Sequence, residues 1–130
     1  MAQNNGQKRI QTIIASRPGV MRQSLLAFIK SYGGVAVVAS AGDGLTAFNQ
    51  VLQYRPGLLL IDSNLLDEEV EALLAAVKAK APATRCLIIV QSNRQEASLL
   101  AAGADGVILR DSSSQQLQET LFRLTRPTLL

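Results

Sequence analysis

Three short apolar runs in this sequence end in residues that could take part in chemistry. GLLLI is followed at once by Asp62, TIIA is followed by Ser16 and Arg17, and GVIL is followed by Arg110. A guanidinium can donate a forked pair of hydrogen bonds to a carboxylate, and it repels the cations that a carboxylate otherwise binds. Asp62 is therefore either a turn residue at the end of a strand or the carboxylate of a site that also contains arginine.

The residue types exclude several other kinds of site. The chain has no histidine, so a Ser-His-Asp triad is impossible, and Ser16 is predicted to be a capping residue. Its one cysteine, Cys86, lies inside the apolar run CLIIV, which excludes a disulfide framework or a zinc site and predicts an inert core thiol. A nucleotide-binding fold is disfavoured because no GxGxxG motif follows the first apolar run. Asp43 and Gly44 are typical of a turn at the start of a helix.

The composition indicates one globular domain. The 130 residues are 48% hydrophobic and 18% charged, and a chain of this length can bury a substantial core. The net charge of +3 comes from scattered residues, which does not indicate direct binding of nucleic acid. No apolar run has the roughly 18 to 20 residues of a membrane span, and the first residues lack the apolar region of a secretory signal. We therefore expect a cytoplasmic protein with no membrane partner.

Strand-length apolar runs alternate with amphipathic stretches along the chain. The predicted strands are Ile10–Ala15, Val35–Ala39, Leu58–Ile61, Cys86–Val90 and Gly106–Leu109, and the predicted helices are Val20–Tyr32, Leu45–Tyr54, Asp67–Ala81, Arg94–Ala102 and Ser113–Leu124. This alternation predicts an α/β fold with a doubly wound parallel sheet. Ligands of such sheets bind beyond the carboxyl ends of the strands. The residues expected at that edge are Ser16, Arg17, Asp62, Val90 to Ser92, and Arg110.

Several longer segments resemble a CheY-like receiver domain, most closely the receivers of response regulators with helix-turn-helix outputs. The resemblance covers about residues 8–124 and rests on IQTIIASRPGVMRQSLLAFI, VVASAGDGLTAFNQVLQYRPGLLLIDSNLL and AAGADGVILRDSSSQQLQETL. It implies a five-stranded, flavodoxin-like (βα)5 sheet with the strand order 2-1-3-4-5. We expect a disordered or loosely ordered tail at residues 1–8, a receiver-like domain at 9–125 and a C-terminal tail at 126–130.

The resemblance also assigns roles to the residues at the strand ends. In receivers an aspartate after the third strand accepts a phosphoryl group, and Asp62 matches this phospho-acceptor. Ser16 and Arg17 stand where the family has an acidic pair that helps to hold magnesium, and Arg110 replaces the family's lysine. Because Mg²⁺ is usually held by carboxylates, no cofactor is predicted and Mg²⁺ binding is disfavoured. Asp62 is instead predicted to pair with Arg17, with Arg110 as a second candidate partner.

Two further positions depart from the receiver pattern. Gln91 or Val90 matches the family's Thr or Ser after the fourth strand, and Ser92 reaches this position only by a shift. Val107 replaces the aromatic residue whose rotation usually reports phosphorylation. The stretch of residues 91–103 is also short by about one turn. The phosphorylation site is therefore predicted to be degenerate.

These features favour an atypical receiver domain, or pseudo-receiver, that is not an enzyme. We expect it to act in signal transduction as a protein-interaction module whose Mg²⁺-dependent phosphorylation is reduced or lost. In the resembled family, a protein partner or a second copy docks on the fourth helix, fifth strand and fifth helix, here Arg94–Ala102, Gly106–Leu109 and Gln115–Leu124. On these elements we expect Leu117 and Leu121 to be buried, and the candidates for contact are Leu99, Leu100 and Phe122.

The alternative is a working phospho-acceptor. In this hypothesis Asp62 takes a phosphoryl group from a histidine kinase or a small phosphodonor and controls transcription, and Asp43 or Asn64 supplies a further metal ligand. Demonstrable binding of magnesium would separate the two hypotheses.

Overall fold

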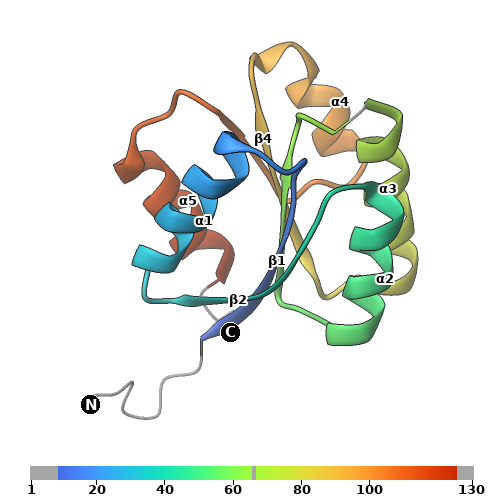
Figure 1. Ribbon diagram of the computed structural model, residues 1–130. Helices are drawn as coiled ribbons and strands as arrows, with labels where there is room; N and C mark the ends of the chain where they lie inside the picture. Colours follow the sequence, from blue (N-terminus) through green and yellow to red (C-terminus); the bar gives the residue numbers. More distant parts are fainter. Residues whose placement is uncertain (1–8, 66, 126–130) are drawn as a thin grey trace, which may run out of the picture.

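The computed structural model describes residues 9–65 and 67–125, which build one parallel sheet. Its strands are β1 (Ile10–Ala15), β2 (Val35–Ala41), β3 (Leu58–Asp62), β4 (Arg85–Val90) and β5 (Gly106–Leu109). They lie in the order β2-β1-β3-β4-β5, which confirms the predicted flavodoxin-like α/β fold (Figure 1). The predicted tails at 1–8 and 126–130 lie outside the described residues.

The helices form a layer on each face of the sheet. They are α1 (Val20–Ser31), α2 (Gly44–Tyr54), α3 (Asp67–Lys80), α4 (Glu96–Ala101) and α5 (Ser114–Thr125). Figure 1 shows α1 and α5 on one face and α2, α3 and α4 on the other. The chain turns toward opposite sides after β1 and after β3, so the carboxyl ends of these two neighbouring strands flank the topological switch point. Within the described chain, no helix has the length and apolar character needed to cross a membrane.

Most element boundaries lie within one residue of the sequence prediction, and the larger differences lie near the carboxyl ends of the strands. β2 continues two residues beyond Ala39, and β3 includes Asp62, which pairs with Ile89 of β4. A short 3₁₀ turn (Asn93–Gln95) precedes α4, which has only six residues. The segment between β4 and Gly103 thus holds little more than one turn of α-helix after its 3₁₀ turn.

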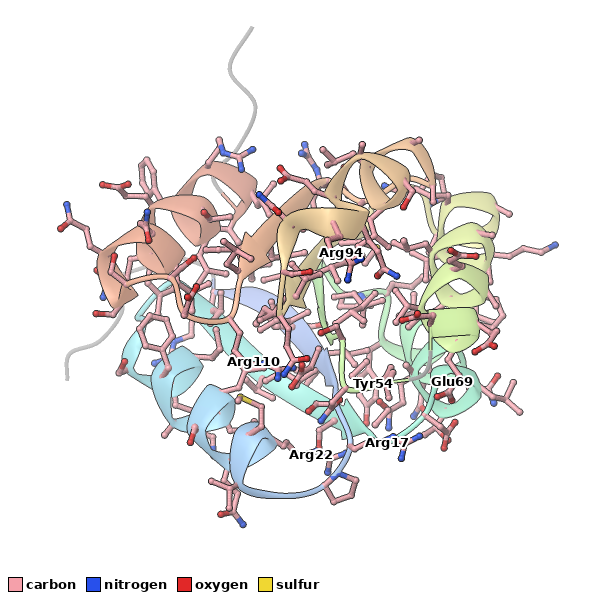
Figure 2. All side chains as sticks on the ribbon, turned by 90° about the horizontal axis from the view of Figure 1, so that it is seen from above. Arg17, Arg22, Tyr54, Glu69, Arg94 and Arg110 are labelled. Atoms are coloured by element: carbon pink, nitrogen blue, oxygen red, sulfur yellow. The ribbon has the colours of Figure 1, made fainter. Side chains whose placement is uncertain are left out.

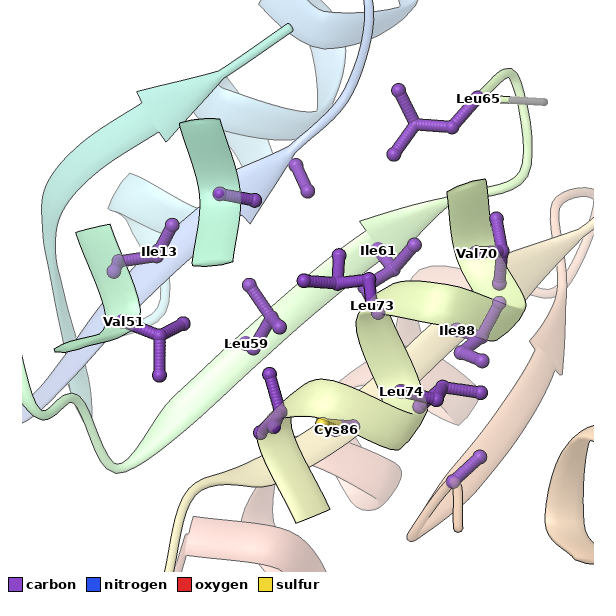
Figure 3. Packing of buried hydrophobic residues seen from close by; sticks show 14 of the residues in the cluster. Ile13, Val51, Leu59, Ile61, Leu65, Val70, Leu73, Leu74, Cys86 and Ile88 are labelled. Atoms are coloured by element: carbon purple, nitrogen blue, oxygen red, sulfur yellow. The ribbon is translucent and has the colours of Figure 1, made fainter. Parts of the chain in front are cut away.

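The core consists of two apolar clusters separated by the sheet. Successive side chains of a strand point to opposite faces, so Ile13 packs toward α2 and α3 while Ile14 packs toward α1 and α5. In the first cluster, side chains of β1, β3 and β4 meet Val51 of α2 and Leu73 and Leu74 of α3 (Figure 3). The central strands are buried on both faces, which holds their carboxyl ends in fixed positions.

Cys86 is a free, fully buried residue of the first cluster, as predicted. Its backbone N–H donates to Asp105 Oδ2 over 2.8 Å, and this oxygen also accepts a hydrogen bond of 2.9 Å from Lys78 Nζ. Burial of the thiol raises its pKa to about 12. The residue therefore serves packing, because only a thiolate is reactive.

We expect the Cys86 thiol of the native protein to be protected from a maleimide at about pH 8, where a thiol with this raised pKa is protonated. A sample unfolded in guanidinium chloride should react rapidly and serves as the control. The folded state holds this proton more tightly than the unfolded chain, so the free energy of unfolding should fall as the pH rises from 9.0 toward about 12. Rapid labelling of the native protein would contradict the burial of Cys86.

Candidate functional site

Asp62 forms the centre of a polar cluster at the carboxyl end of the sheet. Its side chain is 1% exposed, although β3 places it beside the switch point. Oδ1 accepts hydrogen bonds from Arg110 Nη2 at 2.6 Å and from the Asn64 backbone N–H at 3.2 Å. Oδ2 accepts a hydrogen bond of 3.2 Å from Ser16 Oγ. Both carboxylate oxygens are thus occupied by donors of the protein itself.

Arg110 supplies the charged partner of Asp62 and follows β5 directly. Its backbone N–H donates to the carbonyl of Val90 over 2.7 Å, which continues the β4–β5 pairing and fixes the residue at the sheet edge. Figure 2, which views the sheet from above its end, shows the Arg110 side chain in the centre of the molecule between α1 and α5. Its Nη2 also lies 3.5 Å from Ser63 Oγ. The predicted second candidate is therefore the residue that pairs with Asp62.

Arg17, the predicted first partner of Asp62, does not make this ion pair. It is exposed, and its backbone N–H donates to Asn64 Oδ1 over 3.1 Å. Within residues 9–65 and 67–125, its guanidinium has no hydrogen bond or ion pair. The physical reason is the alternation of an extended chain: Ser16 points inward to Asp62, so the next side chain points to solvent.

Ser16 is a member of the site and not the capping residue that was predicted. Its side chain is fully buried, and its hydroxyl lies between Asp62 Oδ2 and the amide of Asn64, whose Nδ2 is 3.4 Å away. The N-cap residue of α1 is Gly19, which makes no side-chain cap bond. The backbone N–H of Ser16 donates to the carbonyl of Ala41 over 2.8 Å, which continues the β1–β2 pairing.

Arg22 belongs to the same cluster and was missed in the sequence. Its Nε and Nη2 donate to the backbone carbonyl of Ser16 over 3.0 and 2.5 Å. This fork ties the first turn of α1 to the loop that precedes it (Figure 2). A signal was present, because a cation in the first turn of a helix is unfavourable for the helix dipole and therefore suggests another partner.

The other predicted site positions lie around this cluster without joining it. Gln91 is exposed after β4 and lines a shallow polar pocket together with Ser63 and Arg94. Val107 is half-buried against the first core cluster and supplies no aromatic ring. Asp43 caps α2 by accepting a hydrogen bond of 2.7 Å from the Thr46 N–H, which confirms the predicted helix start. This bond lowers the pKa of the Asp43 carboxyl.

The predicted docking surface needs one correction. Leu99 is 5% exposed and belongs to the first core cluster, so it is not a contact candidate. Leu121 is buried as predicted, and Leu117 is half-buried against the second cluster. Leu100 and Phe122 are 44% and 56% exposed. The accessible apolar side chains among the predicted contacts are therefore these last two.

The donor set around Asp62 does not fit a magnesium ion. Mg²⁺ needs oxygen ligands in near-octahedral geometry, usually including carboxylates. Asp62 supplies a carboxylate, but a guanidinium already contacts its Oδ1 at 2.6 Å and a second guanidinium holds the carbonyl of Ser16. In the described part of the chain, no group of three or more His, Cys, Asp or Glu residues could hold a metal ion. The cluster instead neutralises its buried carboxylate with arginine.

Sequence comparisons identify relatives among regulatory proteins. No family model matches the chain. It is 31% identical over 112 residues to the oxygen regulatory protein NreC of Staphylococcus epidermidis, and this alignment covers 83% of the chain and 51% of NreC. The identity to NreC of Staphylococcus aureus strain JH9 is 30%, with the same coverage. The chain thus spans about half the length of these relatives.

Solved structures share the fold over nearly the whole chain. The signal receiver domain of the response regulator NarL from Mycobacterium tuberculosis superposes with a TM-score of 0.83 at 21% identity, covering 93% of this chain and 99% of that one. A DNA-binding response regulator of the LuxR family from Staphylococcus aureus gives a TM-score of 0.79 at 22% identity, covering 90% and 99%. At these identities the likeness shows a shared fold.

Replacing Arg110 by glutamine should lower the free energy of unfolding by about 3 kcal/mol, because the carboxylate of Asp62 stays buried without its charged partner. Adding Asp62→Asn to this variant should restore part of the loss, since it removes the stranded charge. Arg17→Gln is the matched control, and its effect should stay within about 0.5 kcal/mol because the side chain is exposed. Urea denaturation measures all three. Equal losses for Arg110→Gln and Arg17→Gln would contradict the ion-pair assignment.

Proposed function

We propose that this chain is a CheY-like receiver domain related to response regulators of the LuxR and NarL class, and that it acts in two-component signal transduction as a protein-interaction module. Its similarity to NreC and to solved receiver structures supports this proposal. In this proposal its Mg²⁺-dependent phosphorylation is reduced or lost, which makes it an atypical receiver. The proposal places the protein in the cytoplasm, where response regulators act. The chain spans only about half the length of NreC. Control of transcription by a protein of that length is therefore a proposal as well.

The single observation that carries the proposal is that donors of the protein itself contact both oxygens of the Asp62 carboxylate. One oxygen is bonded to Arg110 and to the Asn64 N–H, and the other is bonded to Ser16. A carboxylate that attacks phosphorus needs a free oxygen, and its ion pair with a guanidinium lowers its readiness to react. The attacking oxygen would first have to leave a hydrogen bond to the protein.

The replacement of the family's acidic pair by Ser16 and Arg17 also disfavours phosphorylation of Asp62. In phosphoryl transfer, a metal ion normally neutralises the charge that develops on the transferring oxygens. Arg110 supplies positive charge near Asp62, but its Nη2 is already directed at the carboxylate and at Ser63. Arg17 has the charge but points to solvent. We infer that the Mg²⁺-dependent phosphorylation of Asp62 is reduced or lost.

The proposed output is contact with a protein partner or a second copy through α4, β5 and α5. Receiver domains in general use these elements for dimerisation. Leu100 and Phe122 are the exposed apolar side chains that would enter such a contact, and apolar area buried at an interface is a main source of binding energy. A surface of this kind would be presented constantly, without a phosphorylation signal.

A working phospho-acceptor is the second candidate function. It is favoured by the position of Asp62 at the end of β3 and by the positive charge of Arg110 after β5. The polar pocket beside it, of about 340 Å³ and lined by Ser63, Gln91 and Arg94, would offer room for a phosphodonor. In this case a histidine kinase would be the donor partner, and Arg110 would have to release the carboxylate.

The proposal predicts that the 130-residue chain, incubated with acetyl phosphate and Mg²⁺, gains no phosphoryl adduct on Asp62 in intact-mass spectrometry. The LuxR-class receiver of a conventional regulator, treated in parallel, shows that the reagent is active. An adduct that appears in the wild type and disappears in Asp62→Asn would establish the second candidate instead. An adduct that persists in Asp62→Asn would lie on another residue and leave the proposal standing.

A variant that restores the acidic pair should regain the metal. We expect Ser16→Asp combined with Arg17→Asp and Arg110→Lys to have a lower melting temperature than the wild type in EDTA, because Ser16→Asp places a second carboxylate beside buried Asp62. Mg²⁺ should raise this melting temperature by binding the folded state. The wild type should show no Mg²⁺-dependent rise. A rise of equal size in both proteins would show that the native site already binds the metal.

A further inference from the structure

An apolar groove of about 340 Å³ runs between α2 and α3. Its walls come from both helices: Leu45 and Phe48 belong to α2, and Ala72, Leu73 and Ala76 belong to α3. Figure 1 shows α2 and α3 side by side on one face of the sheet. The residues that line the groove include none from α4, β5 or α5, so it is separate from the proposed docking surface.

Large apolar side chains at this groove remain in contact with water. Leu45 is 72% exposed, and Leu52, about two turns further along α2, is 36% exposed. The outer side of α3 carries small side chains instead, because Ala72, Ala75 and Ala79 are exposed. Small side chains leave room for another helix to approach closely. Covering the two leucines with such a helix would remove apolar area from water, which is favourable.

Hydrogen bonds join α2 and α3 at both ends of the groove. Where the two helices begin, the Gly44 N–H donates to Glu69 Oε2 over 3.2 Å, and Figure 2 shows Glu69 between their ends. Where they finish, Arg55 Nη1 donates to the carbonyl of Lys80 over 2.9 Å. The two helices therefore form one preformed surface, which lowers the conformational cost of covering it.

Charge along this surface changes sign from one end to the other. The helices begin with acidic residues, Asp43 at the N-cap of α2 and Glu68 in the first turn of α3. They end with basic residues, Arg55 at the C-cap of α2 and Lys80 in the last turn of α3. All four residues are exposed. Because α2 and α3 both have this polarity, the surface is complementary to itself in an antiparallel arrangement.

We propose that this groove binds a second copy of the chain, about a twofold axis that runs perpendicular to α2 and α3. In such a pair, α2 packs antiparallel to α2 of the second copy, and α3 packs antiparallel to α3. Glu68 of each copy then faces Lys80 of the other. Asp43 of each copy faces Arg55 of the other in the same way.

The spacing of the charges favours a second copy as the occupant. The same number of residues separates Asp43 from Arg55 and Glu68 from Lys80, so one twofold axis brings both kinds of pair into register. The same axis lets the exposed Leu45 of each copy meet α2 of the other. A parallel arrangement would place acidic ends together and basic ends together, and like charges across an interface repel.

This inference goes beyond the proposed function, whose docking surface consists of α4, β5 and α5. A pair formed through α2 and α3 uses none of these elements, so it would present the docking surface twice. A partner with two binding sites would then bind the pair more tightly than a single copy. The pairing does not depend on whether Asp62 accepts a phosphoryl group.

Sedimentation velocity tests the association, with Phe122→Glu included in every sample to remove contact through α5. We expect the Phe122→Glu chain to form reversible dimers whose fraction rises between roughly 10 and 500 µM, as for a small interface. Adding Leu45→Lys should weaken this association at least about tenfold, because it places a cation among apolar side chains and near Arg55 of the second copy. Leu45 is 72% exposed, so the change should not impair folding.

Charge reversal tests the antiparallel register at about 0.05 M salt, where surface charges are weakly screened. Glu68→Lys makes both members of the α3 pair basic, and Lys80→Glu makes both acidic, so each variant alone should associate at least about tenfold more weakly. An equimolar mixture of the two restores opposite charges across the twofold axis and should recover the association. Glu71→Lys, the same change on the side of α3 toward Leu99 of α4, is the matched control and should associate normally.

Three outcomes would overturn the proposal. The first is a Phe122→Glu chain that stays monomeric up to roughly 1 mM, which would leave the groove to a different protein. The second is unchanged association after Leu45→Lys. The third is a mixture of Glu68→Lys and Lys80→Glu that associates no better than either variant alone. These measurements need no phosphodonor and no contact through α5, so their failure and the failure of the proposed function can be told apart.

Discussion

The buried ion pair between Asp62 and Arg110 is the constraint on which the polar end of the molecule depends. A carboxylate that is 1% exposed at the tip of a central strand needs a nearby positive charge and hydrogen bonds to offset its lost hydration. Arg110 supplies the charge, and Ser16 and Asn64 supply further donors. The strand order makes this possible, because the carboxyl ends of β1 and β3 are adjacent and only β4 separates β3 from β5.

Two arginines of the protein hold together the polar region at the carboxyl end of the sheet. Arg22 binds the carbonyl of Ser16, and Arg110 binds Asp62. Two guanidinium groups thus organise the loop after β1 and the end of β3. In this arrangement the geometry is set when the chain folds, whereas a metal site acquires its geometry only when the ion binds. A cluster whose geometry is fixed on folding is compatible with the proposed docking surface on α4, β5 and α5, which would be present without a phosphorylation signal.

The sequence was sufficient for the fold but only partly for the site. Alternation of apolar runs and amphipathic stretches predicted the five strands and five helices, since burial on both faces makes central strands continuously apolar. It also placed Ser16, Asp62 and Arg110 at one edge. It could not decide which arginine pairs with Asp62, because this depends on the side to which residue 17 points after the strand ends. Arg22 was missed because its partner is a backbone carbonyl, and its place in the first turn of α1 indicated only that it needs a partner outside the helix.

The ion pair also has a consequence for the order of folding events. Asp62 and Arg110 are 48 residues apart, and β4 lies between their strands in the sheet. The two side chains therefore meet only after β3, β4 and β5 have assembled in register. Contacts that form after the transition state govern how slowly a protein unfolds, and they leave the folding rate almost unchanged. The pair would then slow the unfolding of the assembled sheet and have little effect on the rate at which the sheet folds.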